Sequence, residues 1–381
     1  MTRGTGKVAA PAALAMVDKQ NKSTHIDLIY LVRALVKFNA SDLHLKAMSP
    51  PLYRINGKLA PAKMDALTPD QVKEIVHGAL TSKQLADLEK NLQVDLAIGV
   101  NDSGRFRCNV YYQRGTLAVA VRRIPFNVPA IEDLGIPSVV TELCMRPRGL
   151  LLVTGPTGSG KSTTLAAMVR HINELRHAHI LTIEDPMEYV HRDIKCAITQ
   201  REVGIDTHSI QDGLHAGLRQ DPDIVMIGEM RDYETMRVAI TAAETGRLVM
   251  STLHTIDAKS TVERIMAVFP QDAQNQIRIQ LATTLVGVIS QQLVMRADGE
   301  SRIPACEVMV KSPAIEKYIM DNELDRLGDA IATSNTYYRM QTMNQSLEEL
   351  VRCGMVLSED AVKVSQYPEE LKMRLSGIVR E

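Results

Sequence analysis

The sequence predicts an α/β fold in which a nucleotide-binding domain follows a smaller α+β domain. The phosphate-loop pattern G-x-x-x-x-G-K-[ST] occupies residues 155–162, between an apolar run and a Gly- and Pro-free stretch of helical length. Further along the chain, short apolar runs alternate with helical stretches, which is typical of buried parallel strands joined by crossover helices. The expected strands cover 150–154, 180–183, 224–227 and 248–253.

The smaller domain is expected over residues 25–124, where helical periodicity and strand-like alternation follow one another. The expected helices cover 25–38 and 68–89, and the expected strands cover 41–45, 52–55, 94–100 and 105–124. A Pro-rich linker at 125–130 then leads into the nucleotide-binding domain, 131–375, whose part after residue 271 is expected to be mostly helical. Residues 1–24 are interpreted as a disordered extension.

Composition narrows the possible partners and compartments. The chain of 381 residues has a net charge of −1, no Trp and four Phe, which argues against a nucleic-acid-binding surface built on charge or stacking. Its five cysteines form no C-x-x-C pair, which argues against a cysteine zinc site and for a reduced, cytoplasmic chain. No stretch is long and apolar enough to predict insertion into a membrane.

The residue types of the loop at 155–162 suit phosphate binding. Glycines let backbone N–H groups point inward, and with the following helix N-terminus they form a nest for phosphate oxygens. Lys161 would reach the outer phosphates of ATP, and the Ser162 hydroxyl would bind Mg²⁺. An ordinary Gly-rich turn is disfavoured because Lys161 and Ser162 both fit. The predicted nucleotide-binding residues are Gly155, Pro156, Thr157, Gly158, Ser159, Gly160, Lys161, Ser162 and Thr163.

Carboxylates follow two of the expected strands. Glu184, Asp185 and Glu188 follow one strand, where one of them would orient the attacking water; a capped turn with solvated acids is the alternative. Glu229 ends the strand at 224–227, as does the acid that holds the metal shell in phosphate-loop enzymes. His254 ends the next strand and is predicted to sense phosphate, although such a histidine is more often structural.

Arginines cluster on the strands of the smaller domain. They are Arg105, Arg107, Arg114, Arg122 and Arg123. In a monomer they would be solvated strand residues. In a ring, such arginines can meet the γ-phosphate held by a neighbouring subunit.

Together these motifs resemble one family, the hexameric type II/IV secretion ATPases, and within it the PilT/PilU-like retraction ATPases of type IV pili. The resemblance spans about residues 25–375. Beside the phosphate loop, the matching motifs are SDLHL (41–45), EDPME (184–188), QREV (200–203), LRQDPD (218–223), GEMRD (228–232), AETG (243–246) and TLHT (252–255).

The resemblance implies a PAS-like N-terminal domain, a RecA-like ATPase domain with C-terminal helices, and a homohexamer that binds ATP and Mg²⁺ between neighbouring subunits. It implies that Glu188 is the general base, that Glu229 holds the Mg²⁺ shell and that His254 belongs to a histidine box. It also implies Arg107 and Arg122 as trans-acting arginines, with Arg105 and Arg123 as alternatives. The implied activity is ATP hydrolysis that powers pilus retraction and twitching motility.

The same resemblance implies cytoplasmic partners at the pilus base: an inner-membrane platform protein and a paralogous pilus ATPase. Two residues depart from the family pattern. Arg247 replaces the His that usually follows AETG, and Glu316, in AIEKYI (314–319), replaces the Arg of the retraction motif AIRNLI. An assembly or secretion ATPase, a RecA-like nucleic-acid translocase and an ATP-gated adaptor are the alternatives, and the absence of a four-cysteine zinc site favours retraction over assembly.

Overall fold

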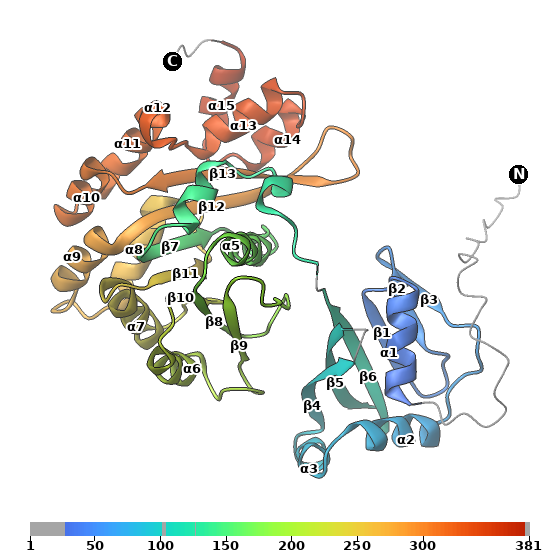
Figure 1. Cartoon of the computed structure of the whole chain (residues 1–381). Coiled ribbons are helices and arrows are strands. Elements are labelled where there is room, and N and C mark those ends of the chain that lie inside the picture. The colour runs from blue at the N-terminus through green and yellow to red at the C-terminus, as the bar shows by residue number, and fades with distance from the viewer. Residues whose placement is uncertain (1–26, 101–103, 126, 378–381) are drawn as a thin grey trace, which may run out of the picture. The chain divides into compact units, whose positions relative to one another are not determined.

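The computed structural model describes residues 27–100, 104–125 and 127–377. The chain divides into two compact units, residues 1–126 and 127–381 (Figure 1). Each unit has its own core of buried apolar side chains. The expected extension at 1–24 and part of the expected linker lie outside the described residues.

The N-terminal unit is a six-stranded sheet with strand order β3-β2-β1-β6-β5-β4, in which all paired strands are antiparallel. Its strands are β1 (Asp42–Lys46), β2 (Leu52–Ile55), β3 (Lys58–Pro61), β4 (Gln93–Val100), β5 (Gly104–Gln113) and β6 (Thr116–Ile124), and its helices are α1 (Leu28–Lys37), α2 (Pro69–Ala79) and α3 (Ser82–Asn91). Helices α1 and α2 pack on the central strands β1 and β6. They bury one face of the sheet, because side chains alternate between faces along each strand.

Two expected elements of this unit were wrong in their extent. The single helix expected over 68–89 is two helices, because Thr81 and Gln84 form a capping box that starts α3: the Thr81 N–H donates to Gln84 Oε1 at 2.9 Å. The strand expected over 105–124 is a hairpin, in which Arg114 and Gly115 both adopt positive φ at the turn.

The C-terminal unit is a seven-stranded sheet with strand order β13-β12-β7-β11-β10-β8-β9. Its strands are β7 (Gly149–Thr154), β8 (His179–Glu184), β9 (Ala197–Glu202), β10 (Ile224–Ile227), β11 (Leu248–Leu253), β12 (Leu285–Met295) and β13 (Arg302–Val310). The expected strands are confirmed as β7, β8, β10 and β11, and they are parallel to their neighbours. All residues of β7, β10 and β11 are buried, so both faces of the sheet are covered.

The helices of this unit surround the sheet (Figure 1). They are α4 (Val139–Cys144), α5 (Lys161–Leu175), α6 (Ile210–Gly217), α7 (Tyr233–Glu244), α8 (Ala258–Val268), α9 (Gln274–Thr284), α10 (Pro313–Met320), α11 (Leu327–Thr333), α12 (Asn335–Tyr338), α13 (Met343–Arg352), α14 (Ser358–Val364) and α15 (Pro368–Leu375), with short 3-10 turns η2 (Ile131–Leu134), η3 (Leu218–Gln220) and η4 (Leu324–Arg326). Among the described residues, no helix has both the length and the apolar character that crossing a bilayer requires.

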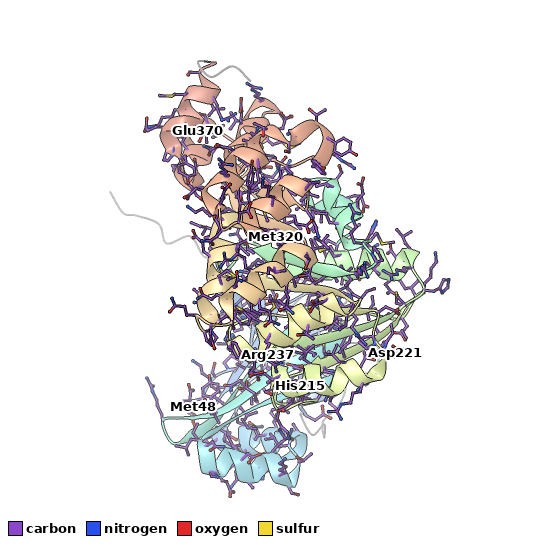
Figure 2. All side chains as sticks on the ribbon, turned by 90° about the vertical axis from the view of Figure 1, so that its left-hand side faces the viewer. Met48, His215, Asp221, Arg237, Met320 and Glu370 are labelled. Atoms are coloured by element: carbon purple, nitrogen blue, oxygen red, sulfur yellow. The ribbon has the colours of Figure 1, made fainter. Side chains whose placement is uncertain are left out.

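The expectation of a mostly helical region after residue 271 was wrong for β12 and β13. These two long strands form an antiparallel hairpin, and β12 also pairs in parallel with β7. Their apolar residues suited buried helix and buried strand equally well, so periodicity did not separate the two. Helix α13 packs on β13, α14 packs on β12, and α15 packs on α13 and α14, so that the three helices share a small separate core with the hairpin. Figure 2 shows Glu370, on α15, at one end of the unit and His215 and Arg237, on the neighbouring helices α6 and α7, towards the other.

Candidate functional site

A cavity of about 580 Å³ opens at the carboxyl ends of the parallel strands of the C-terminal unit. Such an edge is where open α/β sheets bind their ligands. Of the residues that the sequence singled out, the cavity brings together Thr157, Gly158, Gly160, Lys161, Ser162, Thr163, Glu184, Asp185, Glu188, Glu229 and His254, whereas Gly155, Pro156 and Ser159 do not line it. Arg107 and Arg122 belong to the N-terminal unit.

The loop at 155–162 connects β7 to α5, and its glycines have the backbone conformation that the motif requires. Gly155, Gly158 and Gly160 have φ values of 140°, 80° and 92°. Residues other than glycine rarely adopt such positive φ values. At Gly155 there is also no room, since a Cβ atom would lie 2.2 Å from the carbonyl oxygen of Gln291. Strand β12 therefore forms the floor of the loop.

The loop contains polar groups that could donate hydrogen bonds to a bound phosphate. The Ser159 hydroxyl is buried and has no hydrogen-bond partner among the described residues. Lys161 is buried, and its Nζ donates to the carbonyl oxygens of Gly155 and Pro156 at 2.8 and 3.1 Å. Burial lowers the pKa of Lys161, while the charges of Glu229 and Glu188 oppose that shift. A buried cation and an unpaired donor at a helix N-terminus fit an anionic ligand.

Gln291 on β12 hydrogen-bonds to the loop, and it was not predicted from the sequence. Its side chain is buried; Nε2 donates to the carbonyl oxygen of Ser159 at 2.6 Å, and Oε1 accepts from Thr164 Oγ1 at 2.9 Å. One amide group therefore fixes both the loop and the first turns of α5. The signal was present in the sequence, because the polar run at 290–292 interrupts an otherwise apolar stretch.

The acids at 184–188 have different environments. Glu184 is buried and accepts hydrogen bonds from Thr182 Oγ1 and Gln200 Nε2 at 2.7 and 3.1 Å. Burial raises the pKa of Glu184 to about 7 despite these bonds. Asp185 and Glu188 are exposed and line the cavity. The charge of Glu188 acts on Lys161, whereas that of Asp185 acts on Arg231.

Glu229, His254 and Arg231 form a hydrogen-bonded group on the far side of the cavity. Glu229 Oε1 lies 3.0 Å from His254 Nε2, and Oε2 lies 2.8 Å from an Arg231 guanidinium nitrogen. Burial alone would raise the pKa of Glu229, but the hydrogen bond from Arg231 and the charge of His254 lower it. Glu229 is therefore held as a carboxylate beside Arg231 and His254.

The cavity also contains residues that no motif pointed out. Tyr189 lines it, and its hydroxyl lies 3.1 Å from Thr163 Oγ1. Leu293 and Arg302 come from the unexpected β12–β13 hairpin. Leu293 and Arg302 were missed because the hairpin itself was missed.

The arginines of the N-terminal unit form a row across its sheet. Arg107 on β5 stands opposite Arg122 on β6, and Arg122 stands opposite Asp42 on β1. Arg122 Nε lies 2.9 Å from Asp42 Oδ1. Burial alone would raise the pKa of Asp42, but hydrogen bonds from Ser41 and Arg122 lower it. The row lies on the face opposite the core, since the alternate residues of β5 are buried.

The alternative arginines differ in position. Arg123 pairs with the buried Phe106 and so belongs to the core-facing side of the sheet, near the C-terminal end of β6. Its guanidinium contacts Asn39 Oδ1 at 3.4 Å. Arg105 shares the face of Arg107, and its Nε is buried. The exposed Arg107 and Arg122 are the members of the cluster that stand side by side across paired strands.

The two residues that depart from the family pattern lie away from the cavity. Arg247 precedes β11, and its guanidinium donates to Thr245 Oγ1 at 3.0 Å. Glu316 lies in the first turn of α10 and pairs with Lys311 Nζ at 3.4 Å. Neither contributes a side chain to the cavity.

Comparison with known proteins gives matches along nearly the whole chain. The family model described as "Type II/IV secretion system protein" matches residues 25–366. The type IV pilus retraction ATPase PilT of Pseudomonas aeruginosa is 42% identical over 344 residues, which cover 90% of this chain and 99% of PilT. The type IV pilus ATPase PilU of the same organism is 38% identical and covers 91% of this chain, with 90% of PilU covered.

A solved structure shows the same fold. The crystal structure of the pilus retraction motor PilT with bound ADP has a TM-score of 0.84 and 44% sequence identity, and the match covers 91% of this chain and 99% of that one. The resemblance that the motifs indicated is therefore confirmed, and so is the mixed α/β fold. The chain belongs to the type II/IV secretion system protein family and, within it, is similar to the pilus retraction ATPases.

Proposed function

We propose that this chain is an ATP-hydrolysing ring motor that powers retraction of a type IV pilus. The observation that carries the proposal is that the phosphate loop, Glu188, Glu229 and His254 line one cavity. The full-length similarity to PilT, whose solved structure holds ADP, supports the same ligand and activity.

The proposed architecture follows the family. Residues 25–124 form a PAS-like domain, 125–130 a linker, and 131–375 a RecA-like ATPase domain with C-terminal helices and the β12–β13 hairpin. Six copies form a ring, with ATP held between the ATPase domain of one subunit and the N-terminal domain of the next. The ring works at the cytoplasmic face of the inner membrane, with a pilus platform protein and a paralogous pilus ATPase as partners.

In this site the loop amides and Lys161 bind the β- and γ-phosphates. Lys161 Nζ exchanges its bonds to Gly155 and Pro156 for phosphate oxygens, so its desolvation is compensated in the bound state. Mg²⁺, when bound, would neutralise developing phosphate charge. Ser162 and Glu229 would hold its shell, which fits an ion that uses few protein ligands beside substrate phosphates and water.

Glu188 is the proposed general base for the attacking water. Both Glu188 and Glu184 line the cavity, but Glu188 is exposed and its charge acts on Lys161, whereas Glu184 is buried and bonded to Thr182 and Gln200. His254, linked to Glu229, senses the γ-phosphate. Phosphoryl transfer is accelerated mainly by such positioning and charge stabilisation. Arg107 and Arg122 complete the site of a neighbouring subunit.

The decisive experiment measures the ATPase rate against protein concentration, with the mass determined in the same buffer. We expect activity to rise steeply with assembly and to accompany a hexamer. Full activity in a monomer would contradict the interface mechanism while leaving ATP hydrolysis intact. Absence of hydrolysis by the hexamer would contradict the enzyme assignment itself.

Deletion of the gene separates retraction from assembly. Loss of a retraction motor is expected to leave excess surface pili without twitching, whereas loss of an assembly ATPase leaves none. Glu316 makes this test informative, because its carboxylate pairs with Lys311 where the retraction motif has Arg.

Replacing Arg107 or Arg122 by alanine is expected to lower turnover by roughly 100-fold or more while leaving nucleotide affinity within the ATPase domain almost unchanged. An arginine that reaches a neighbour's γ-phosphate contributes at least this much. Steady-state ATPase rates and ADP titrations measure the two effects. Arg54→Ala is the matched control, since Arg54 also pairs with Asp42, at 3.4 Å. Unchanged turnover in both variants would contradict the trans-arginine role.

Replacing Gln291 by leucine is expected to weaken ADP binding by about tenfold. The change keeps much of the side-chain volume but removes the hydrogen bonds to Ser159 and Thr164. The loss of each hydrogen bond is expected to lower the affinity for ADP by a few-fold. Fluorescent-ADP titration measures the dissociation constant. Gln292→Leu, on the other face of β12, is the control, and equal affinities of the two variants would show that the clamp is not needed.

A further inference from the structure

The segment that follows His254 is fixed by contacts from a distant part of the chain. It runs from Thr255 to Ala258 between β11 and α8. The Ile256 carbonyl oxygen accepts from Gln366 Nε2 at 3.0 Å, and the Ala258 N–H donates to Glu307 Oε1 at 2.8 Å. His254 itself contacts Glu229 at the cavity.

Glu307 lies on β13 and joins two helix N-termini. Its carboxylate accepts from the backbone N–H of Ala258, where α8 begins, and from that of Met343, where α13 begins. Burial raises the pKa of Glu307 to about 7, and the nearby Asp257 contributes to that rise. Removing a carboxylate even partly from water is costly unless donors surround it, and the positive ends of two helices provide them.

Gln366 links the same segment to the C-terminal helices. It lies in the short connection between α14 and α15. These helices and α13 share a core with the β12–β13 hairpin, built around Val294, Ile303 and Leu347. The segment after His254 is thus attached to the hairpin through Glu307 and to the helices through Gln366.

We propose that Glu307 and Gln366 are positioning residues that set the location of His254 through the segment 255–258, so that the packing of the C-terminal helices controls the hydrolysis step. The inference rests on the proposed ATPase function. Neither side chain lines the cavity, so their effect passes through the backbone of the segment. Small displacements of a group that contacts reacting phosphate reduce turnover strongly.

The test is a double-mutant cycle on the full-length hexamer, with kcat and the KM for ATP measured for each variant. Glu307→Ala is expected to lower kcat by roughly tenfold with KM almost unchanged, because the phosphate loop is untouched. Glu307→Gln should restore most of kcat, since its amide oxygen can still accept from Ala258. Gln366→Ala should lower kcat by about threefold, the effect of a single hydrogen bond.

The cycle with His254→Ala separates positioning from general destabilisation. Once His254 is gone, Glu307→Ala should have no further effect on kcat, because coupled residues are not additive. Glu348→Ala is the control: Glu348 is a buried acid of α13 that pairs with Arg352 and Arg374 rather than with the segment. Glu348→Ala should lower the melting temperature, and its effect on kcat should not depend on whether His254 is present.

Three results would overturn the inference: wild-type kcat in Glu307→Ala, a loss that simply multiplies with that of His254→Ala, or an equal loss in Glu348→Ala. If Glu307→Ala does not fold, the same double-mutant cycle with His254→Ala is measured with Gln366→Ala instead. A wild-type kcat in Gln366→Ala would then overturn the proposal. A wild-type protein that hydrolyses no ATP would overturn the proposed function and this inference with it.

Discussion

Replacing Lys161 by alanine is expected to abolish ATP hydrolysis, with a loss of at least about 100-fold in turnover. Lys161 is the buried cation of the cavity, and its ammonium lies within hydrogen-bond distance of the loop carbonyls. Alanine removes the charge that would meet the outer phosphates and leaves those carbonyls to water. Steady-state phosphate release measures the loss.

Nucleotide binding gives an independent readout of the same substitution. A ligand present at 100 times its dissociation constant stabilises the folded protein by about 2.7 kcal/mol, so ADP should raise the melting temperature of the wild-type chain. In Lys161→Ala that rise should shrink or disappear. Lys73→Ala, an exposed lysine on α2, is the control and should retain both activity and the rise. Wild-type turnover in Lys161→Ala would remove Lys161 from the mechanism.

The parallel core of the fold could be predicted because its signals are local. The apolar runs that became β7, β8, β10 and β11 are short and bounded by helical stretches. Their parallel pairing then places the strand-end residues Glu188, Glu229 and His254 around one cavity. Pattern and spacing along the chain were sufficient to place the acids at 184–188, Glu229 and His254 at this edge of the sheet, whereas the choice of Glu188 among those acids came from the family resemblance.

The rest of the site depends on contacts between residues far apart in sequence. Gln291 reaches the phosphate loop only because β12 pairs with β7, and Glu307 reaches Ala258 only because β13 pairs with β12. Apolar periodicity does not distinguish a buried strand from a buried helix of similar length. With the hairpin unrecognised, neither of these two contacts could be predicted.

The arginines show a similar limit. Sequence showed a cluster but not which members share a face, because that requires the register between strands. The register places Arg107 opposite Arg122 and turns Arg123 to the other side. Within SDLHL, Asp42 is the residue that pairs with Arg122.

Replacing Glu188 by glutamine is expected to leave ATP binding intact and to reduce turnover by roughly 100- to 10,000-fold, the range of a lost general base. Glutamine keeps the shape of the side chain but cannot accept a proton from water. The variant should therefore bind ATP and hold it, with a normal nucleotide-dependent rise in melting temperature. Single-turnover hydrolysis separates this slow chemical step from product release.

Two neighbouring acids provide the controls that make the assignment specific. Asp185→Asn changes an exposed acid of the same segment whose charge acts on Arg231 rather than on Lys161, so its turnover should fall much less. Glu184→Gln changes the buried acid that organises Thr182 and Gln200, so its cost should appear in stability. If Glu188 is the general base, only Glu188→Gln among the three variants should bind ATP normally and yet lose hydrolysis. If Asp185→Asn shows that combination instead, the water is activated from the Arg231 side of the cavity.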